Sequence, residues 1–384
     1  MTPRIKLSAL VEFQRRKMRI SRQPNMQGAW TQTGSRLVDN VEFGSNPGGL
    51  RMLSYVPQGL PPGAPLVVAL HGCTQTATDY DRGCGWSDMA ERSGFALLMP
   101  EQRRANNAHL CFNWFEPGDT GRDRGEALSI RQMINQMLEV HALDPRQVYI
   151  SGLSAGGAMT SVMLACYPEV FAAGAVIAGL PHGAASNVQE ALGAMARPLD
   201  LPATIRARAL RSASSYCGVW PRVAVWHGEA DTTVHPGNAE EVAKQWLGVH
   251  NLAGVSPQHG IGDGGEKLQR WFGEGGAVQV AVHRVVGLGH GMPIAAGRKA
   301  GQCGEAGPYV LEAGCSATHG ILAFWGLPTG GDAMPKAEIL PPGRPEQADP
   351  RAPLSALAQA WHAAENGPAE VISRALRAAG LLRR

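Results

Sequence analysis

The sequence predicts an α/β fold in which helices cover both faces of a mostly parallel central sheet. Short apolar runs bounded by turn residues, such as residues 66–70, are typical of strands buried on both faces. Helical patterns alternate with these runs along the chain, as they do in parallel sheets. Residues 148–159 combine an apolar strand, a tight turn and a helix start, and the turn carries a serine among small residues.

The chain begins with a polar, irregular segment, residues 1–35, which we expect to be an N-terminal extension with one short helix near residues 7–15. A hairpin is predicted at residues 38–56, because Asn46-Pro47-Gly48-Gly49 is a strong turn sequence between two apolar stretches. A single α/β domain is then predicted to cover residues 36–327.

Strands and helices follow one another through this domain. Besides the strand that begins at residue 148, strands are expected at residues 66–70, 95–99, 171–178, 222–226 and 278–286. Helices are expected at residues 86–92, 125–141, 239–247 and 318–325. We expect Pro100 to end the second strand. Residues 260–265 match a glycine-rich dinucleotide pattern, but no helical pattern opens after them, so we predict a flexible loop.

The composition changes after Leu327. Residues 328–353 are rich in proline and glycine and are typical of a linker. Residues 354–384 form a predicted helical tail, with short helices at residues 354–363 and 369–382. This tail docks on the body, pairs two chains in a homodimer, or stays loose, and the sequence leaves these three alternatives open.

Charge and hydropathy exclude several classes of partner. The net charge of +3 over 384 residues is small, and no long basic block indicates a nucleic-acid surface. No apolar run is long enough to span a bilayer, so no membrane partner is expected. Residues 1–20 lack a sustained apolar core followed by a cleavage site, which predicts a cytoplasmic protein.

The seven cysteines do not form a C-x-x-C metal pair. Because their number is odd, at least one thiol stays free. Cys303 and Cys315 flank a glycine-rich loop, which a disulfide between them could close. The alternative is that the cysteines are reduced and buried.

Gly152-Leu153-Ser154-Ala155-Gly156 fits the G-x-S-x-G nucleophile elbow, a sharp turn that exposes a serine hydroxyl above the sheet. Glycine and serine are common here, so the pattern alone is weak. The apolar strand before it and the small residues after it make it specific. We therefore predict Ser154 as a catalytic nucleophile.

A serine hydroxyl needs a general base, and the base needs an orienting carboxylate. In an α/β-hydrolase sheet they follow the serine in the order acid, then histidine, each on a loop after a strand. Asp231 and His290 have these positions, so we predict a Ser154–Asp231–His290 triad. Glu229 is an alternative acid. His227 and His235 are weaker candidates for the base, because a base there would break the expected order.

The oxyanion formed during ester cleavage needs backbone N–H donors. The amides of Cys73 and Ala155 are the predicted donors, because one loop follows an early strand and the other residue follows the nucleophile. Thr74, Trp114 and Trp226 are candidate substrate contacts, although tryptophans such as Trp226 more often fill a core.

Taken together, these residues make the chain resemble the poly(3-hydroxybutyrate) depolymerase family of esterases. The stretches that carry the resemblance are LHGCTQ at residues 70–75, CGWSD at 84–88, PEQ at 100–102, NWF at 113–115, GLSAGGAM at 152–159, WHGEAD at 226–231 and GLGHG at 287–291. They span roughly residues 40–327.

The resemblance implies an α/β-hydrolase fold, a Ser154–Asp231–His290 triad, and no metal ion or other cofactor. It also implies ester hydrolysis through an acyl-enzyme, with polyester chains or their oligomers as substrates. Feruloyl and acetylxylan esterases share much of this pattern, which makes a carbohydrate esterase or a general short-chain carboxylesterase the alternative. Secreted members of the family make an extracellular location the alternative to the cytoplasm.

Overall fold

The computed structural model describes residues 34–329. The predicted helix at residues 7–15, most of the predicted linker and the whole predicted tail lie outside these residues. The proposed pairing of two chains through the tail therefore stays a prediction, as do the domain boundaries. No helix within residues 34–329 combines the length and apolarity that crossing a bilayer requires.

A ten-stranded sheet forms the centre of the described body, in the order β1-β2-β4-β3-β5-β6-β7-β10-β9-β8. Its strands are β1 (Val38–Asn40), β2 (Arg51–Tyr55), β3 (Leu66–Leu70), β4 (Ala96–Glu101), β5 (Val148–Leu153), β6 (Ala173–Ile177), β7 (Arg222–Gly228), β8 (Gln258–Ile261), β9 (Lys267–Phe272) and β10 (Val278–Val285). The strands from β4 to β10 in this order run parallel, and the two outer pairs at each end of the sheet are antiparallel. The predicted, mostly parallel sheet is confirmed.

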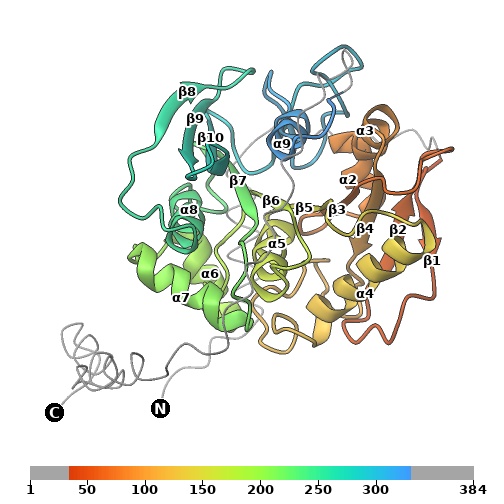
Figure 1. Cartoon of the computed structure of the whole chain (residues 1–384), viewed down its shortest axis with the longest axis horizontal. Coiled ribbons are helices and arrows are strands. Elements are labelled where there is room, and N and C mark those ends of the chain that lie inside the picture. The colour runs from red at the N-terminus through yellow and green to blue at the C-terminus, as the bar shows by residue number, and fades with distance from the viewer. Residues whose placement is uncertain (1–33, 330–384) are drawn as a thin grey trace, which may run out of the picture. The chain divides into compact units, whose positions relative to one another are not determined.

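Helices cover both faces of this sheet (Figure 1). They are α2 (Ala77–Cys84), α3 (Trp86–Ser93), α4 (Gly125–Val140), α5 (Ala155–Cys166), α6 (Val188–Ala196), α7 (Ala203–Ala213), α8 (Asn238–Val249) and α9 (Ala317–Trp325). Helices α4, α5, α7 and α8 pack on one face, with Leu66 and Val68 of β3. Helices α2, α3 and α9 pack on the other face, with Val67 and Ala69. Since successive strand residues point to opposite faces, β3 is apolar throughout.

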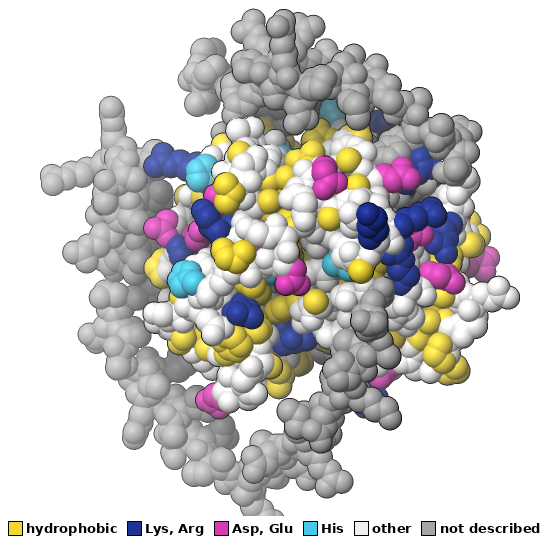
Figure 2. Space-filling model, turned by 90° about the horizontal axis from the view of Figure 1, so that it is seen from above, with side chains coloured by type: hydrophobic (Ala, Val, Ile, Leu, Met, Phe, Trp, Pro, Cys, Tyr) yellow, Lys and Arg dark blue, Asp and Glu magenta, His cyan; other side chains and the backbone are white. Residues whose placement is uncertain are grey.

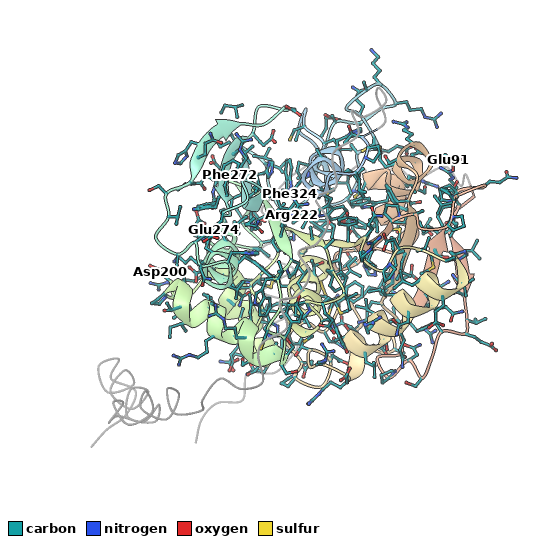
Figure 3. All side chains as sticks on the ribbon, viewed as in Figure 1. Glu91, Asp200, Arg222, Phe272, Glu274 and Phe324 are labelled. Atoms are coloured by element: carbon teal, nitrogen blue, oxygen red, sulfur yellow. A yellow bond between two sulfur atoms is a disulfide. The ribbon has the colours of Figure 1, made fainter. Side chains whose placement is uncertain are left out.

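Contacts between side chains fix α9 to the start of β7. The Arg222 guanidinium lies 5.1 Å from the centre of the Phe324 ring, and Figure 3 shows the two side chains close together. On the face seen in Figure 2, acidic and basic side chains are interspersed.

Two predicted element boundaries are wrong. Strand β4 does not end before Pro100 but continues to Glu101, and Pro100 pairs with Met52 of β2. The register of β4 with β3 stops at Leu98, so beyond that residue β4 has a partner on one side and tolerates proline as an edge strand does.

The glycine-rich stretch at residues 260–265 is not a flexible loop. Gly260 and Ile261 end β8, and the Gly262 amide donates to the Glu266 carbonyl at 2.8 Å, closing a hairpin into β9. Strand β9 follows this turn, whereas the dinucleotide pattern requires a helix there. A second sheet of two short parallel strands, β11 (Met292–Ile294) and β12 (Val310–Glu312), lies after β10 in the chain.

Candidate active site

The turn between β5 and α5 holds Ser154 in a strained conformation. Its φ of +57° and ψ of −114° are unusual for a residue with a side chain. Glycine is required on either side of it: a Cβ on Gly152 would lie 2.3 Å from the Gly156 carbonyl oxygen, and one on Gly156 would lie 2.4 Å from that of Leu70. The absence of these side chains lets the helix begin directly against the sheet.

His290 connects Ser154 to Asp231. Its Nε2 lies 2.9 Å from Ser154 Oγ, and its Nδ1 lies 2.7 Å from Asp231 Oδ2. With the ring proton on Nδ1, the imidazole donates to the carboxylate and accepts the serine hydroxyl proton. The structure thus brings the three predicted residues, from the ends of β5, β7 and β10, into one hydrogen-bonded chain. Ser154 is 9 % exposed, which leaves its hydroxyl at the edge of solvent.

The Asp231 carboxylate is inaccessible to solvent, but many donors surround it. Oδ1 accepts the backbone amides of Thr233 and Val234 at 2.8 and 2.9 Å. Oδ2 accepts from His290 and lies 3.2 Å from His227 Nε2. Burial raises the pKa of Asp231, but hydrogen bonds from the two histidines outweigh it and hold the pKa well below its usual value. Asp231 is therefore ionised and oriented toward His290.

Backbone hydrogen bonds join the loop that carries the acid to the loop that carries the histidine. The Glu229 amide donates to Val285 at 3.0 Å, and the Ala230 amide donates to Leu288 at 2.9 Å. The two loops are neighbours because they follow β7 and β10, which pair in parallel. Their distance is fixed by this pairing, so His290 reaches Asp231 without depending on a flexible segment.

The alternative residues do not reach this chain of hydrogen bonds in the same way. Glu229 forms an ion pair with Lys267, at 2.8 Å, rather than contacting His290. His235 is exposed, and its Nδ1 accepts the Gly237 amide. His227 does contact Asp231, but its Nε2 also faces the Val234 carbonyl, and among residues 34–329 only His290 joins Asp231 to Ser154.

The predicted oxyanion donors lie on the β3 loop and at the first residue of α5. Within residues 34–329, neither the Cys73 amide nor the Ala155 amide donates a hydrogen bond. The β3 loop lies against the elbow, since a Cβ on Gly72 would be 3.4 Å from the Leu153 carbonyl oxygen. Two backbone N–H groups near Ser154 that lack an acceptor among residues 34–329 have the chemistry that an oxyanion needs.

A disulfide fastens the β3 loop. Cys73 is bonded to Cys111, which lies on the loop after the neighbouring strand β4. In addition, the Thr74 amide donates to the His109 carbonyl at 2.7 Å. The loop is therefore tied to the β4 loop by a covalent bond and a backbone hydrogen bond.

A buried polar network lies behind the disulfide. The backbone N–H of Gln102 donates to His71 Nε2 at 3.1 Å. The Gln102 side-chain Nε2 donates to the Cys111 carbonyl at 3.0 Å and to Glu126 Oε1 at 2.5 Å. Glu126 Oε2 accepts the Asn113 amide at 2.9 Å. Burial raises the pKa of Glu126 to about 8, despite these donated hydrogen bonds.

The proposed bridge between Cys303 and Cys315 is not present, because both thiols are free and buried. Cys303 Sγ instead lies 3.2 Å from Ser316 Oγ and 3.3 Å from the Cys84 carbonyl oxygen. The alternative, reduced buried cysteine, holds for these two residues. Within the described residues no group of three or more His, Cys, Asp or Glu side chains is arranged to hold a metal ion.

The predicted substrate contacts have different surroundings. Trp226 is 1 % exposed, and its ring stacks on His283 at 3.8 Å, so the prediction of a substrate contact is wrong for this residue. Trp114 is also buried and packs edge-on against Phe115. Thr74 is exposed on the β3 loop, and for it the prediction stands untested.

Sequence reasoning missed three features of the site: the Cys73–Cys111 disulfide, the contact of His227 with Asp231, and buried Glu126. A signal was available for the disulfide, since both cysteines follow predicted strands that are neighbours along the chain. The roles of His227 and Glu126 depend on loops folding back over them, which no local pattern predicts.

Comparison with known proteins independently supports ester hydrolysis as the chemistry of this chain. A family model described as "Esterase PHB depolymerase" matches residues 53–270. A poly(3-hydroxyalkanoate) depolymerase C of Paucimonas lemoignei is 43 % identical over 294 residues, covering 76 % of this chain and 70 % of that protein. A feruloyl esterase B of Thermothelomyces thermophilus is 36 % identical, covering 64 % of this chain and 89 % of that protein. Among solved structures, an acetyl xylan esterase from Aspergillus awamori superposes with a TM-score of 0.61 at 27 % identity, over 67 % of this chain and 94 % of that one.

Proposed function

Because the chain belongs to the PHB depolymerase family of serine-type carboxylic ester hydrolases, we propose that it cleaves poly(3-hydroxybutyrate)-type polyesters or their oligomers. The proposal rests on one observation above all. His290 bridges Ser154 Oγ and Asp231 Oδ2 at 2.9 and 2.7 Å, with the serine at a strained elbow. This arrangement is suited to acyl transfer from an ester to a serine.

In the proposed reaction, Ser154 Oγ attacks the ester carbonyl carbon while His290 Nε2 takes the hydroxyl proton. Asp231 keeps the ring proton on Nδ1 and stabilises the imidazolium that forms. The same proton is then given to the alcohol leaving group, which leaves an acyl-enzyme. Water attacks the acyl-enzyme with His290 as the base again, and the acid and free Ser154 are released.

Negative charge develops on the carbonyl oxygen in both steps. We assign its stabilisation to the amides of Cys73 and Ala155, which have no hydrogen-bond acceptor among the described residues. Fixed N–H donors stabilise such charge effectively because they need no reorganisation during the reaction. The disulfide and the buried network hold the Cys73 amide against thermal displacement.

The decisive experiment compares parent enzyme and Ser154→Ala on five substrates: a short p-nitrophenyl ester, hydroxybutyrate oligomers, amorphous polymer film, methyl ferulate and acetylated xylan. Serine-dependent release of hydroxybutyrate from oligomer or film is the expected result. Full activity of Ser154→Ala, with the fold intact by circular dichroism, would overturn the assignment of the nucleophile.

A carbohydrate esterase is the second candidate. It is favoured by the 36 % identity to a feruloyl esterase B and by the superposition on an acetyl xylan esterase. Serine-dependent activity that is confined to ferulate or xylan acetate would select this candidate and leave the mechanism unchanged.

The disulfide bears on where the enzyme works. Disulfides persist in oxidising compartments, so the Cys73–Cys111 bond favours the extracellular alternative over the predicted cytoplasmic location. Alkylation of the unfolded protein without reductant, followed by mass spectrometry, should label five of the seven cysteines.

Truncation after Leu327 and a mass measurement would test the proposed homodimer.

A further inference from the structure

His227, near the end of β7, lies directly beneath the carboxylate of Asp231. Its Nε2 is 3.2 Å from Asp231 Oδ2 and 3.0 Å from the Val234 carbonyl oxygen, and neither the His227 nor the Asp231 side chain is accessible to solvent. We infer that His227 is a positioning residue for the catalytic acid: its Nε2–H holds Asp231 Oδ2 in place, so that two imidazoles share one carboxylate oxygen. This inference rests on the proposed triad and deepens it.

The surroundings of the ring determine which nitrogen carries the proton. Nε2 faces two oxygen acceptors, a carbonyl and a carboxylate. Nδ1 is buried and has no hydrogen-bond partner among residues 34–329. A proton on Nδ1 would leave an N–H without an acceptor and two oxygens facing a nitrogen lone pair. The contacts therefore select the tautomer with the proton on Nε2.

The sequence of β7 dictates where the imidazole points. Strand residues alternate between the faces of a sheet, and Trp226 packs toward α9. His227 consequently points to the opposite face, where Val225 also packs. The next residue, Gly228, allows close approach of the neighbouring loop, since a Cβ there would lie 2.3 Å from the Leu288 carbonyl oxygen.

The acid loop then turns back over the imidazole and closes a ring of hydrogen bonds. Asp231 Oδ1 accepts the amides of Thr233 and Val234, and the Val234 carbonyl faces His227 Nε2. His227 Nε2 thus contacts the first residue of this turn, Asp231, and its last, Val234. Without its N–H, Asp231 Oδ2 would keep only His290 as a partner, and the Val234 carbonyl would lose its buried donor.

A second donor on Oδ2 also affects the charge that His290 experiences. The two imidazoles are the titratable groups that contact Asp231 and lower its pKa. Each N–H draws on the same oxygen, so the bond from His227 weakens the stabilisation that Asp231 gives to a protonated His290. Removing the His227 donor should make His290 easier to protonate while loosening the orientation of the carboxylate.

Three substitutions separate donation from packing. The side-chain amide nitrogen of His227→Gln falls near the position of Nε2 and can still donate, whereas that of His227→Asn falls near Nδ1, which has no partner. These two variants are matched in polarity. His227→Leu removes the donor and keeps much of the volume. Thermal unfolding of each variant reports whether packing has changed.

The first measurement is independent of turnover: ¹⁵N NMR of the histidine-labelled full chain, with His227→Gln used to assign the resonance. We expect the Nε2–H tautomer for His227. The Nδ1–H tautomer would overturn the inference. This result stands even if the substrate panel shows no serine-dependent activity, which would count against the proposed function instead.

The second measurement is the pH dependence of kcat and kcat/KM. His227→Gln should stay within about threefold of the parent, while His227→Asn and His227→Leu should each lose about tenfold in kcat with little change in KM. In those two variants the acidic limb of kcat/KM, which reports protonation of the base, should move to higher pH. If both lose thermal stability but retain kcat and the position of the limb, His227 only packs the strand and the positioning role is wrong.

Discussion

The structure contains two buried carboxyl groups near the proposed active site, one in the proposed triad and one next to the β3 loop. Their pKa values are shifted in opposite directions. Asp231 supports the histidine, and its pKa is held well below the usual value. Glu126 supports the β3 loop through Gln102 and Asn113, and its pKa is raised to about 8. Both side chains are almost completely removed from solvent, so burial does not by itself determine which form is present.

The difference comes from the number and kind of donors. Asp231 receives two backbone amides and faces two imidazole nitrogens, which together compensate for the loss of hydration. Glu126 receives one amide from the backbone and one from Gln102, and the nearby charge of Asp119 raises its pKa further. A carboxylate that must stay charged during turnover is therefore surrounded by donors, whereas one that only holds a loop can stay protonated.

The largest expected effect is on the acid. Asp231→Asn should reduce kcat by about 10⁴-fold, because the amide presents an N–H to His290 and favours the wrong tautomer of the base. Glu126→Gln is the matched control, since Glu126 is mostly protonated at pH 7 and the amide is likewise uncharged, with one oxygen left to accept from Gln102 or Asn113. It should change kcat by less than tenfold. Equal losses in the two variants, measured with a p-nitrophenyl ester, would erase the contrast between the two carboxylates.

The next effect tests the covalent support of the β3 loop. Cys111→Ser removes the disulfide to Cys73, and kcat should fall by about 10- to 100-fold because a displaced oxyanion donor loses part of its contribution. KM should change less than kcat, since the donor acts mainly in the transition state. Cys217→Ser is the control, because Cys217 is exposed and free. Unchanged kcat in Cys111→Ser would mean that hydrogen bonds alone hold the loop.

The meeting of Ser154, Asp231 and His290 could be predicted from sequence because each residue follows a strand, and parallel strands bring such loops to one edge of the sheet. The error over Trp226 has a physical origin as well. Helices cover both faces of this sheet, so a tryptophan within β7 becomes buried whichever way it points. The possible bridge between Cys303 and Cys315 rests only on the glycine-rich loop that they flank, and both thiols are free. The true partners, Cys73 and Cys111, are 38 residues apart and become neighbours only through the pairing of β3 with β4.

A smaller effect is expected on stability as a function of pH. The pKa of Glu126 lies near 4.5 when unfolded and about 8 when folded, so the unfolded chain loses its proton first. Stability should therefore fall as pH rises from about 4.5 and level off above about 8. Relative to Glu126→Gln, the parent should lose on the order of 5 kcal/mol over this window in urea unfolding, since each pKa unit corresponds to about 1.4 kcal/mol. Asp231 has the opposite sign, with its contribution lost as pH falls below its unfolded pKa of 3.8.

A constant difference in unfolding free energy between parent and Glu126→Gln from pH 5 to 9 would contradict the raised pKa of Glu126. Measurements on Ser154→Ala over the same range provide the control, because that substitution leaves both buried carboxylates in place. The pH at which the unfolding free energies of the parent and Glu126→Gln diverge then reports the ionisation of Glu126. A general change in surface charge would affect Ser154→Ala and Glu126→Gln equally.

The smallest expected effect is that of substitutions at Thr74. They test whether the β3 loop contributes to catalysis through its backbone alone or also through the Thr74 side chain. Thr74 has a φ of +65°, costly for a β-branched residue, and its amide rather than its side chain ties the loop to His109. Thr74→Gly relieves that strain but gains freedom when unfolded, so stability should change by less than about 1 kcal/mol. If only the backbone matters, kcat and KM should both stay within about threefold of the parent. A raised KM in both Thr74→Gly and Thr74→Asn, which also tolerates positive φ, would instead make the side chain a substrate contact and place specificity on the same loop as the oxyanion donor.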